Sequence, residues 1–246
     1  MQYRSQVFWS GLSSYKQFRI PVLLHTAGQE LLAFAEGRPH IQDHGNIDIV
    51  LRRSADGGRT WSPVEALFDG TSLGLARGRR GTTVGNPVPI FIRERRELLL
   101  IFNSNFGGSD ERRIRYGMKA PRGDCKPCLD PSGPAGRRVW LSRSFTMGRN
   151  WSEPIELTPN VKRHEWTWYA VGPGGAIRTH NGTLIIPATH ASQSRFREIH
   201  GKYDHSHVLI SGDLGATWRV GGIAATGTNE ATIAELPGGR LLLNAR

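Results

Sequence analysis

The sequence SADGGRTW, at residues Ser54–Trp61, shows the pattern on which the whole chain is built. The same pattern, Ser-x-Asp-x-Gly-x-Thr-Trp, returns in full as SGDLGATW at Ser211–Trp218. A partial copy, SFTMGRNW, lies between them at Ser144–Trp151, with Thr in place of the Asp and Asn in place of the Thr. We call these three segments the octets. An eight-residue pattern that recurs in this way indicates a protein made of structural repeats.

Each octet has the composition of a tight turn between two strands. Its Ser and Asp side chains can accept hydrogen bonds from nearby backbone N–H groups, and its Gly tolerates a positive φ. The Trp carries a large apolar group back towards a sheet. Runs typical of strands precede the octets, at residues 47–53, 138–141 and 207–210. We therefore expect each octet to be the structural turn of a β-hairpin, with no part in chemistry.

The composition of the 246 residues favours an all-β protein. The chain contains 30 Gly and 14 Pro, which suits many tight turns. Short strand-like runs such as Arg19–Leu24, Glu97–Phe102 and Thr183–Ala188 are joined by turns, without a convincing amphipathic helix. This organisation predicts a β-propeller of four-stranded blades. The octets are further apart than a minimal blade of roughly 40–50 residues, so we expect long loops or a blade without an octet between them.

Two further segments are expected to lie in loops. Residues 70–85 are rich in Gly and Arg, which indicates a loop. Cys125 and Cys128 form a single C-x-x-C, which is half of a zinc site, and no pair of His follows at the spacing of a zinc finger. We expect the two cysteines to lie in a surface loop, and we expect no metal or other cofactor.

The net charge of +11 points to an anionic partner. Nucleic acid, an anionic membrane surface and a small acidic substrate all fit such a charge. No basic helical face or nucleic-acid-binding motif accompanies it, which disfavours nucleic acid. No apolar run is long enough to span a membrane, and residues 1–17 lack the apolar segment of a signal peptide.

Four charged side chains stand beside strand-like runs. Arg19 lies at the start of the first run, Asp43 in the first long loop, Glu230 just before a late run and Arg246 just after its partner. Two arginines on one face of a protein can hold a carboxylate by bidentate hydrogen bonds. Acidic side chains beside them are suited to proton transfer.

The chain resembles the sialidases (neuraminidases), which are six-bladed β-propellers that remove terminal sialic acids. The octets look like the Asp-boxes (BNR repeats) of this family, and Phe18–Pro21 matches its FRIP motif. The likeness covers essentially the whole chain and continues through AEGR at 35–38, DHGNIDIVLRR at 43–53, GNPVP at 85–89, YAVGPG at 169–174, Asn229-Glu230 and LLLNAR at 241–246.

The resemblance implies a role for each of the four charged residues. Arg19 and Arg246 would be two arginines of the triad that binds the sugar carboxylate, and Asp43 would be the acid/base. Asp48 is the competing choice for the acid/base, although it falls inside a strand-like run. Glu230 would activate a Tyr nucleophile, which is an exception to the usual pair of carboxylates in retaining glycosidases. A neutral Tyr suits this substrate because an anionic nucleophile would be repelled by the carboxylate of sialic acid.

The chain departs from the family pattern in one respect. The third arginine and the nucleophilic Tyr are expected after Arg246, where the sequence given stops. We therefore expect residues 1–246 to form a single sialidase propeller domain, truncated at its C-terminal end and containing about four of six blades. We also expect this chain alone to be inactive on sialosides.

The main alternative to exo-α-sialidase activity is a propeller that binds acidic carbohydrates without turnover. Asp-box propellers include members that are not sialidases, so the octets do not separate the two. A sialylated glycan is the expected partner in either case, and nucleic acid and stable membrane insertion are not expected. The family works in the cytosol, in lysosomes, at membranes and outside cells, so the resemblance implies no compartment. It also implies no oligomeric state.

Overall fold

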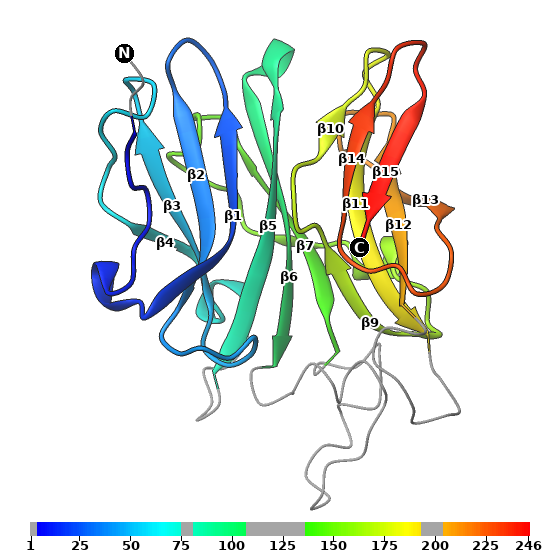
Figure 1. Cartoon of the computed structure of the whole chain (residues 1–246), viewed down its shortest axis with the longest axis horizontal. Helices are drawn as coiled ribbons and strands as arrows, with labels where there is room; N and C mark the ends of the chain where they lie inside the picture. Colours follow the sequence, from blue (N-terminus) through cyan, green and yellow to red (C-terminus); the bar gives the residue numbers. More distant parts are fainter. Residues whose placement is uncertain (1–3, 75–80, 107–135, 193–203) are drawn as a thin grey trace, which may run out of the picture.

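The computed structural model describes residues 4–74, 81–106, 136–192 and 204–246. These residues form four antiparallel sheets and very little helix (Figure 1). Three short 3-10 segments and one α-helical turn (α2) accompany the strands: Leu12–Ser14, Thr71–Leu73, Arg93–Arg95 and Thr158–Val161. Among the described residues, no helix has the length and apolar character needed to cross a membrane. The predicted all-β class is confirmed.

The first two sheets each contain four strands in sequence order. The first sheet consists of β1 (Gln17–His25), β2 (Leu31–Arg38), β3 (Asp48–Ser54) and β4 (Glu65–Phe68). The second sheet consists of β5 (Thr82–Ile92), β6 (Glu97–Phe106), β7 (Arg138–Ser144) and β8 (Ile155–Glu156).

The third sheet repeats this order with an interrupted first strand. Both β9 (Trp166–Val171) and β10 (Ile177–Arg178) pair with β11, so together they take the place of one strand. The remaining strands are β11 (Leu184–Ser192), β12 (Asp204–Ser211) and β13 (Arg219–Ile223). A fourth sheet contains only the hairpin of β14 (Ala231–Glu235) and β15 (Leu241–Ala245). We refer to the first three sheets as blades and to the fourth as the last hairpin.

The blades pack face to face around an incomplete ring (Figure 1). Their first strands, β1, β5 and β9, lie next to one another in succession at the inner edge. Apolar side chains such as Phe34, Leu98 and Phe102 fill the space between the first and second blades. Ile101 and Tyr169 belong to the corresponding cluster between the second and third blades. Since alternate residues of a strand point to opposite faces, these clusters explain why the strands are apolar on both sides. The arrangement is that of an incomplete β-propeller, as predicted.

Each octet links the third and fourth strands of its blade. In the first octet, Asp56 accepts hydrogen bonds from the Thr60 backbone N–H at 2.9 Å and from the Thr60 hydroxyl at 2.6 Å. These bonds hold the pKa of Asp56 well below its usual value. In the partial octet, the Thr146 hydroxyl replaces the carboxylate and accepts one hydrogen bond of 2.8 Å, from the Asn150 N–H. The octets are therefore self-contained turns, as expected.

The expectation of a loop throughout residues 70–85 is wrong, because β5 begins at Thr82. This part of the chain is fixed from both sides: it pairs with β6, and Ile47 bonds to the Thr82 carbonyl at 3.2 Å and to the Val84 N–H at 2.9 Å. Gly85 accordingly lies within a strand. Cys125 and Cys128 lie outside the described residues.

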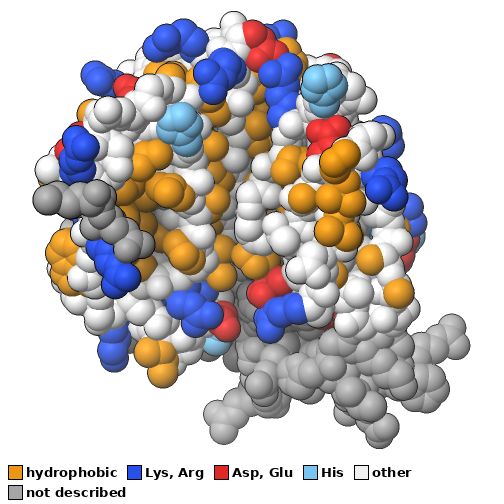
Figure 2. Space-filling model, turned by 45° about the horizontal axis from the view of Figure 1, so that its top comes forward, with side chains coloured by type: hydrophobic (Ala, Val, Ile, Leu, Met, Phe, Trp, Pro, Cys, Tyr) orange, Lys and Arg blue, Asp and Glu red, His pale blue; other side chains and the backbone are white. Residues whose placement is uncertain are grey.

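The end of the molecule at the top of Figure 1 is turned forward in Figure 2. Lys and Arg side chains are spread around the rim of this face, with apolar side chains between them, and do not gather in a single basic patch. The strand connections at 26–30 and 54–64 lie at this end, because β2 begins here and β3 ends here, and the connection at 39–47 between them lies at the other end.

Candidate functional site

A pocket of about 220 Å³ lies at the end of the ring opposite the octets. All three blades and the last hairpin contribute to its lining, which contains four arginines and three carboxylates. The lining residues are Arg19, Ile20, Glu36, Arg38, Asp43, Thr83, Asn86, Arg137, Trp168, Ala170, Gly172, Pro173, Thr189, Asn229, Glu230 and Arg246. The four residues predicted from the sequence as site residues are all among them.

The first blade supplies a charged wall. Arg19 on β1 is the direct cross-strand partner of Glu36 on β2, so their side chains point to the same face. Arg38 follows two residues after Glu36 and therefore shares that face as well. The register of β1 against β2 shifts between Arg19 and Val22, around Ile20 with its φ of 52°. An irregularity of this kind re-aims the neighbouring side chains, and here it lies beside Arg19.

Arg38 connects two carboxylates within this wall. Its Nε donates to Glu36 at 2.9 Å, and its Nη1 makes an ion pair with Asp43. The side chains of Glu36 and Arg38 are each 4% exposed, whereas that of Asp43 is 63% exposed. Burial raises the pKa of Glu36, although the charge and hydrogen bonds of Arg38 oppose this shift. Burial acts to lower the pKa of Arg38, but Glu36 and Asp43 outweigh it, so the pKa is raised and Arg38 stays charged.

The second blade meets this wall at Gly85 and Asn86. A side chain at Gly85 would place its Cβ 2.2 Å from Oε1 of Glu36, so any larger residue would force the Glu36 carboxylate to move. Asn86 has a φ of 55°, and its backbone N–H donates to the same Oε1 at 2.8 Å. The Asn86 Oδ1 accepts a hydrogen bond of 3.2 Å from Arg137, which is buried. The GNPVP segment is thus shaped around the Glu36 carboxylate.

The third blade supplies an apolar wall. Trp168, Ala170 and Pro173 come from β9 and the residues after it, and all line the pocket. The guanidinium of Arg137 lies 5.0 Å from the centre of the Trp168 ring, a favourable cation–π distance. Charged and apolar surfaces therefore face the same small space, an arrangement suited to a ligand that carries both an anionic and an apolar part.

The last hairpin carries Glu230 and Arg246. Arg246 donates to Glu230 through Nε at 2.8 Å, and its backbone N–H bonds to the Glu230 carbonyl at 3.0 Å. Next to them, the Asn229 carbonyl accepts from the Thr189 hydroxyl of β11 at 2.9 Å. The backbone bonds fix the base of the hairpin, and the ion pair joins two side chains that are 75% (Arg246) and 38% (Glu230) exposed.

Asp48 does not line the pocket. It pairs in register with Gly37, so its side chain lies on the face opposite that of Glu36 and Arg38. Its Oδ2 accepts a hydrogen bond of 2.8 Å from the Tyr15 hydroxyl. Of the two aspartates considered from the sequence, Asp43 is the one beside the arginines.

Sequence reasoning assigned no role to Glu36, Arg38, Asn86 or Arg137. The i, i+2 spacing of Glu36 and Arg38 on a predicted strand could have signalled that they share a face. No comparable signal marks Arg137, which is distant in sequence from every other charged residue of the pocket. Among the described residues, no group of three or more His, Cys, Asp or Glu side chains could hold a metal ion.

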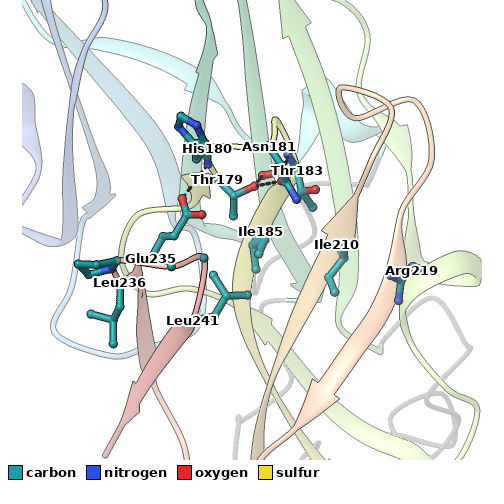
Figure 3. A pocket seen from close by; sticks show the side chains of 13 residues that line it. Thr179, His180, Asn181, Thr183, Ile185, Ile210, Arg219, Glu235, Leu236 and Leu241 are labelled. Carbon is teal, nitrogen blue, oxygen red and sulfur yellow. Dashed lines mark hydrogen bonds between the residues drawn. The ribbon is translucent and has the colours of Figure 1, made fainter.

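A larger cavity of about 860 Å³ lies elsewhere, between the third blade and the last hairpin (Figure 3). Its floor includes Ile185, Ile210 and Leu241, and the His180 N–H donates to the Glu235 carboxylate at 2.7 Å at its rim. None of the residues predicted as site residues lines it. Its few charged groups make it a poor match to an anionic ligand.

The ring of antiparallel blades and the arginine-rich pocket define a β-propeller of the sialidase type. The family model for the BNR repeat-like domain matches residues 28–246. The chain therefore belongs to the BNR repeat-like domain family.

The chain is similar to an exo-alpha-sialidase of Aspergillus fumigatus, with 31% identity over 94% of this chain and 52% of that protein. It is 32% identical to Sialidase-3 of Mus musculus, over 95% of this chain and 53% of that protein. Among solved structures, the Hadza microbial sialidase Hz136 matches with a TM-score of 0.78 and 27% identity, over 95% of this chain and 43% of that one. The chain spans about half the length of the curated relatives it matches. The predicted resemblance to sialidases and the predicted fold are confirmed.

Proposed function

We propose that this chain carries most of the sugar-binding and proton-transfer groups of an exo-α-sialidase that acts on terminal sialic acids of glycans. The observation that carries the proposal is that Arg19, Asp43, Glu230 and Arg246 line one pocket of about 220 Å³, although they come from opposite ends of the chain. In this proposal, Arg19 and Arg246 bind the substrate carboxylate, because guanidinium groups match carboxylates in shape and charge.

The two carboxylates take different parts in the proposed reaction. Asp43 is largely exposed at the pocket and serves as the acid/base that protonates the leaving oxygen. Glu230 polarises a Tyr nucleophile, and attack by that Tyr followed by water gives net retention at the anomeric carbon. No tyrosine is among the described residues that line the pocket. We therefore expect the chain by itself to bind sialic acid without hydrolysing sialosides.

Calorimetric titration of the purified chain with free sialic acid tests the binding. We expect Arg19→Gln to weaken binding at least about tenfold, since it removes a charge-assisted contact. Arg178→Gln is the matched control, because Arg178 pairs with Glu94 on the outside of the molecule, away from the pocket. Equal affinities for the wild type and Arg19→Gln would refute the proposed role of Arg19. Release of sialic acid from a fluorogenic sialoside by the chain alone would refute the expected lack of turnover.

A binding propeller for acidic carbohydrates is the second candidate, favoured by the lack of a tyrosine among the described pocket residues. The two candidate functions predict different affinities for a sugar with a planar ring. An enzyme pocket complements the oxocarbenium-like transition state, so it should bind the 2,3-dehydro analogue of sialic acid at least about tenfold more tightly than sialic acid itself. A binding module should show no such preference.

A further inference from the structure

Glu36 lies in the middle of a chain of contacts that joins the first two blades. Its Oε2 accepts a hydrogen bond of 2.9 Å from Arg38, and Arg38 in turn pairs with Asp43. Its Oε1 accepts a hydrogen bond of 2.8 Å from the Asn86 N–H, and the Asn86 side chain accepts one of 3.2 Å from Arg137. Hydrogen bonds and an ion pair thus run without a break from Arg137 on one side to Asp43 on the other.

The two partners of Arg38 differ in their surroundings. Glu36 is buried and held from both blades, and Gly85 leaves it the room that any other residue would fill. Asp43 is 63% exposed and belongs to the loop at 39–47. The Arg38 guanidinium therefore lies between a buried carboxylate and an exposed one, and the negative charge of Glu36 offsets part of its positive charge.

We propose that Glu36 is a positioning residue that fixes Arg38 and offsets its charge, so that Asp43 is held at the pocket while remaining able to take up a proton. The inference rests on the proposed function in one respect, the role of Asp43 as the acid. The charge relation between Glu36, Arg38 and Asp43 can be tested separately.

Other charged groups surround this chain of contacts and contribute to the electrostatic potential at Asp43. Arg19 lies opposite Glu36 on β1, and Arg137 is close enough to stabilise the Glu36 anion. His40 and His44 flank Asp43 in its loop, and burial lowers the pKa of His40. Glu230 and Arg246 face the pocket as an ion pair. Each of these groups is unchanged in the Glu36→Gln variant, which therefore isolates the charge of Glu36.

The test is a carbon-13 NMR titration of the Asp43 carboxyl group in the chain with labelled aspartate, assigned with Asp43→Asn. Glu36→Gln keeps the shape of the side chain but removes its charge. We expect the titration midpoint of Asp43 to fall by about 0.5 to 1 pH unit, because a nearby negative charge is lost and Asp43 becomes the one carboxylate paired with Arg38. Arg137→Gln removes a positive charge beside Glu36 and is expected to raise the midpoint.

Glu97→Gln is the matched control. Glu97 is also a buried carboxylate paired with an arginine, Arg143, but it lies away from the pocket. The Glu97→Gln variant should lose stability, as Glu36→Gln does, but the titration midpoint of Asp43 should stay unchanged. An unchanged midpoint in Glu36→Gln overturns the inference. If Glu36→Gln does not fold, an unchanged midpoint of Asp43 in Arg137→Gln overturns the inference instead.

Sialic acid binding, measured in parallel on the same proteins, keeps the two proposals apart. A wild-type chain that fails to bind sialic acid refutes the proposed function, whereas the midpoints still decide the role of Glu36. Where the wild type binds, Glu36→Gln is expected to change the pH dependence of affinity, and Glu97→Gln is not.

Discussion

The guanidinium of Arg143, on β7, donates a hydrogen bond of 2.6 Å to the backbone carbonyl of Gly215, in the octet of the third blade. The same relation joins the first blade to the second, because Arg53 on β3 bonds to the carbonyl of Gly148. Each arginine stands directly before the first Ser of its own octet and reaches the octet of the next blade. The octets therefore connect blades as well as strands.

Replacement of Arg143 by Met is expected to destabilise the chain by about 3 kcal/mol. Arg143 also pairs with the buried carboxylate of Glu97, which would keep only the longer contact of 3.8 Å with Arg95, and a poorly compensated buried charge is costly. Urea denaturation measures the change. Arg138→Met is the control, since Arg138 pairs with the partly exposed Glu156 and should cost under about 1 kcal/mol. Equal losses in the two variants would show that the link between blades adds nothing.

Completion of the partial octet should raise the melting temperature. The double change Thr146→Asp with Asn150→Thr restores the carboxylate and hydroxyl that bond at 2.5 Å between Asp213 and Thr217 in the third octet. We expect a rise of about 2 °C by thermal unfolding, in line with the small gain from exposed hydrogen bonds. The reverse change, Asp213→Thr with Thr217→Asn, should lower the melting temperature by a similar amount. A rise in this reverse variant would contradict the role given to the octet Asp.

Gly85→Ala is expected to weaken sialic acid binding at least about tenfold. Its Cβ would meet the Glu36 carboxylate at 2.2 Å, so Glu36 must move and release Arg38. Calorimetric titration with sialic acid provides the measurement. Gly175→Ala is the control, because a Cβ there meets no atom within 4 Å. Normal binding by Gly85→Ala would mean that the position of Glu36 does not matter for the ligand.

His207 is expected to make the fold less stable in mild acid. It is buried, bonds to the Tyr169 hydroxyl at 2.9 Å and lies 3.1 Å from Nδ1 of His190. Burial lowers the pKa of His207 to about 3 from 6.5. A histidine whose pKa is lowered in the folded state binds protons mainly in the unfolded state. It therefore leaves the free energy of unfolding unchanged above about pH 6.5 and lowers it progressively as the pH falls.

At pH 5 this difference amounts to about 2 kcal/mol for one such histidine. Urea denaturation at pH 7.5 and pH 5 should therefore show a smaller loss of stability in His207→Gln than in the wild type. His164→Gln is the control, because the side chain of His164 is 95% exposed. A loss as large in His207→Gln as in the wild type would rule out His207 as a source of the acid sensitivity.

The fold could be predicted from local patterns, whereas the site could be predicted only in part. The octets specify their own turns through bonds between residues four positions apart, such as Asp56 and Thr60, so their signal is complete within eight residues. Arg137 has no such local signal. Its place at the pocket depends on contacts with Asn86 and Trp168, which lie far away in the sequence and come together only when the blades pack.

The expectation of a loop at residues 70–85 failed for a related physical reason. Glycine is common in turns because it tolerates a positive φ, but Gly85 is needed for a different property, the absence of a side chain. Only the packed blades reveal that the Glu36 carboxylate occupies the space where its Cβ would be. Composition does not distinguish these two uses of glycine.

The pocket draws on all four sheets, and this limits how a protein of this kind can vary. Repeat proteins commonly change length by gaining or losing whole units, because each unit contacts only its neighbours. In this chain, gain or loss of a blade between residues 19 and 246 would shift the last hairpin by one blade position around the propeller axis. Arg246 would then lie away from Arg19. The separation of the two arginines thus depends on the number of units between them. New specificity then comes from changes of pocket side chains and of the connecting loops, while the number of blades between these two residues stays the same.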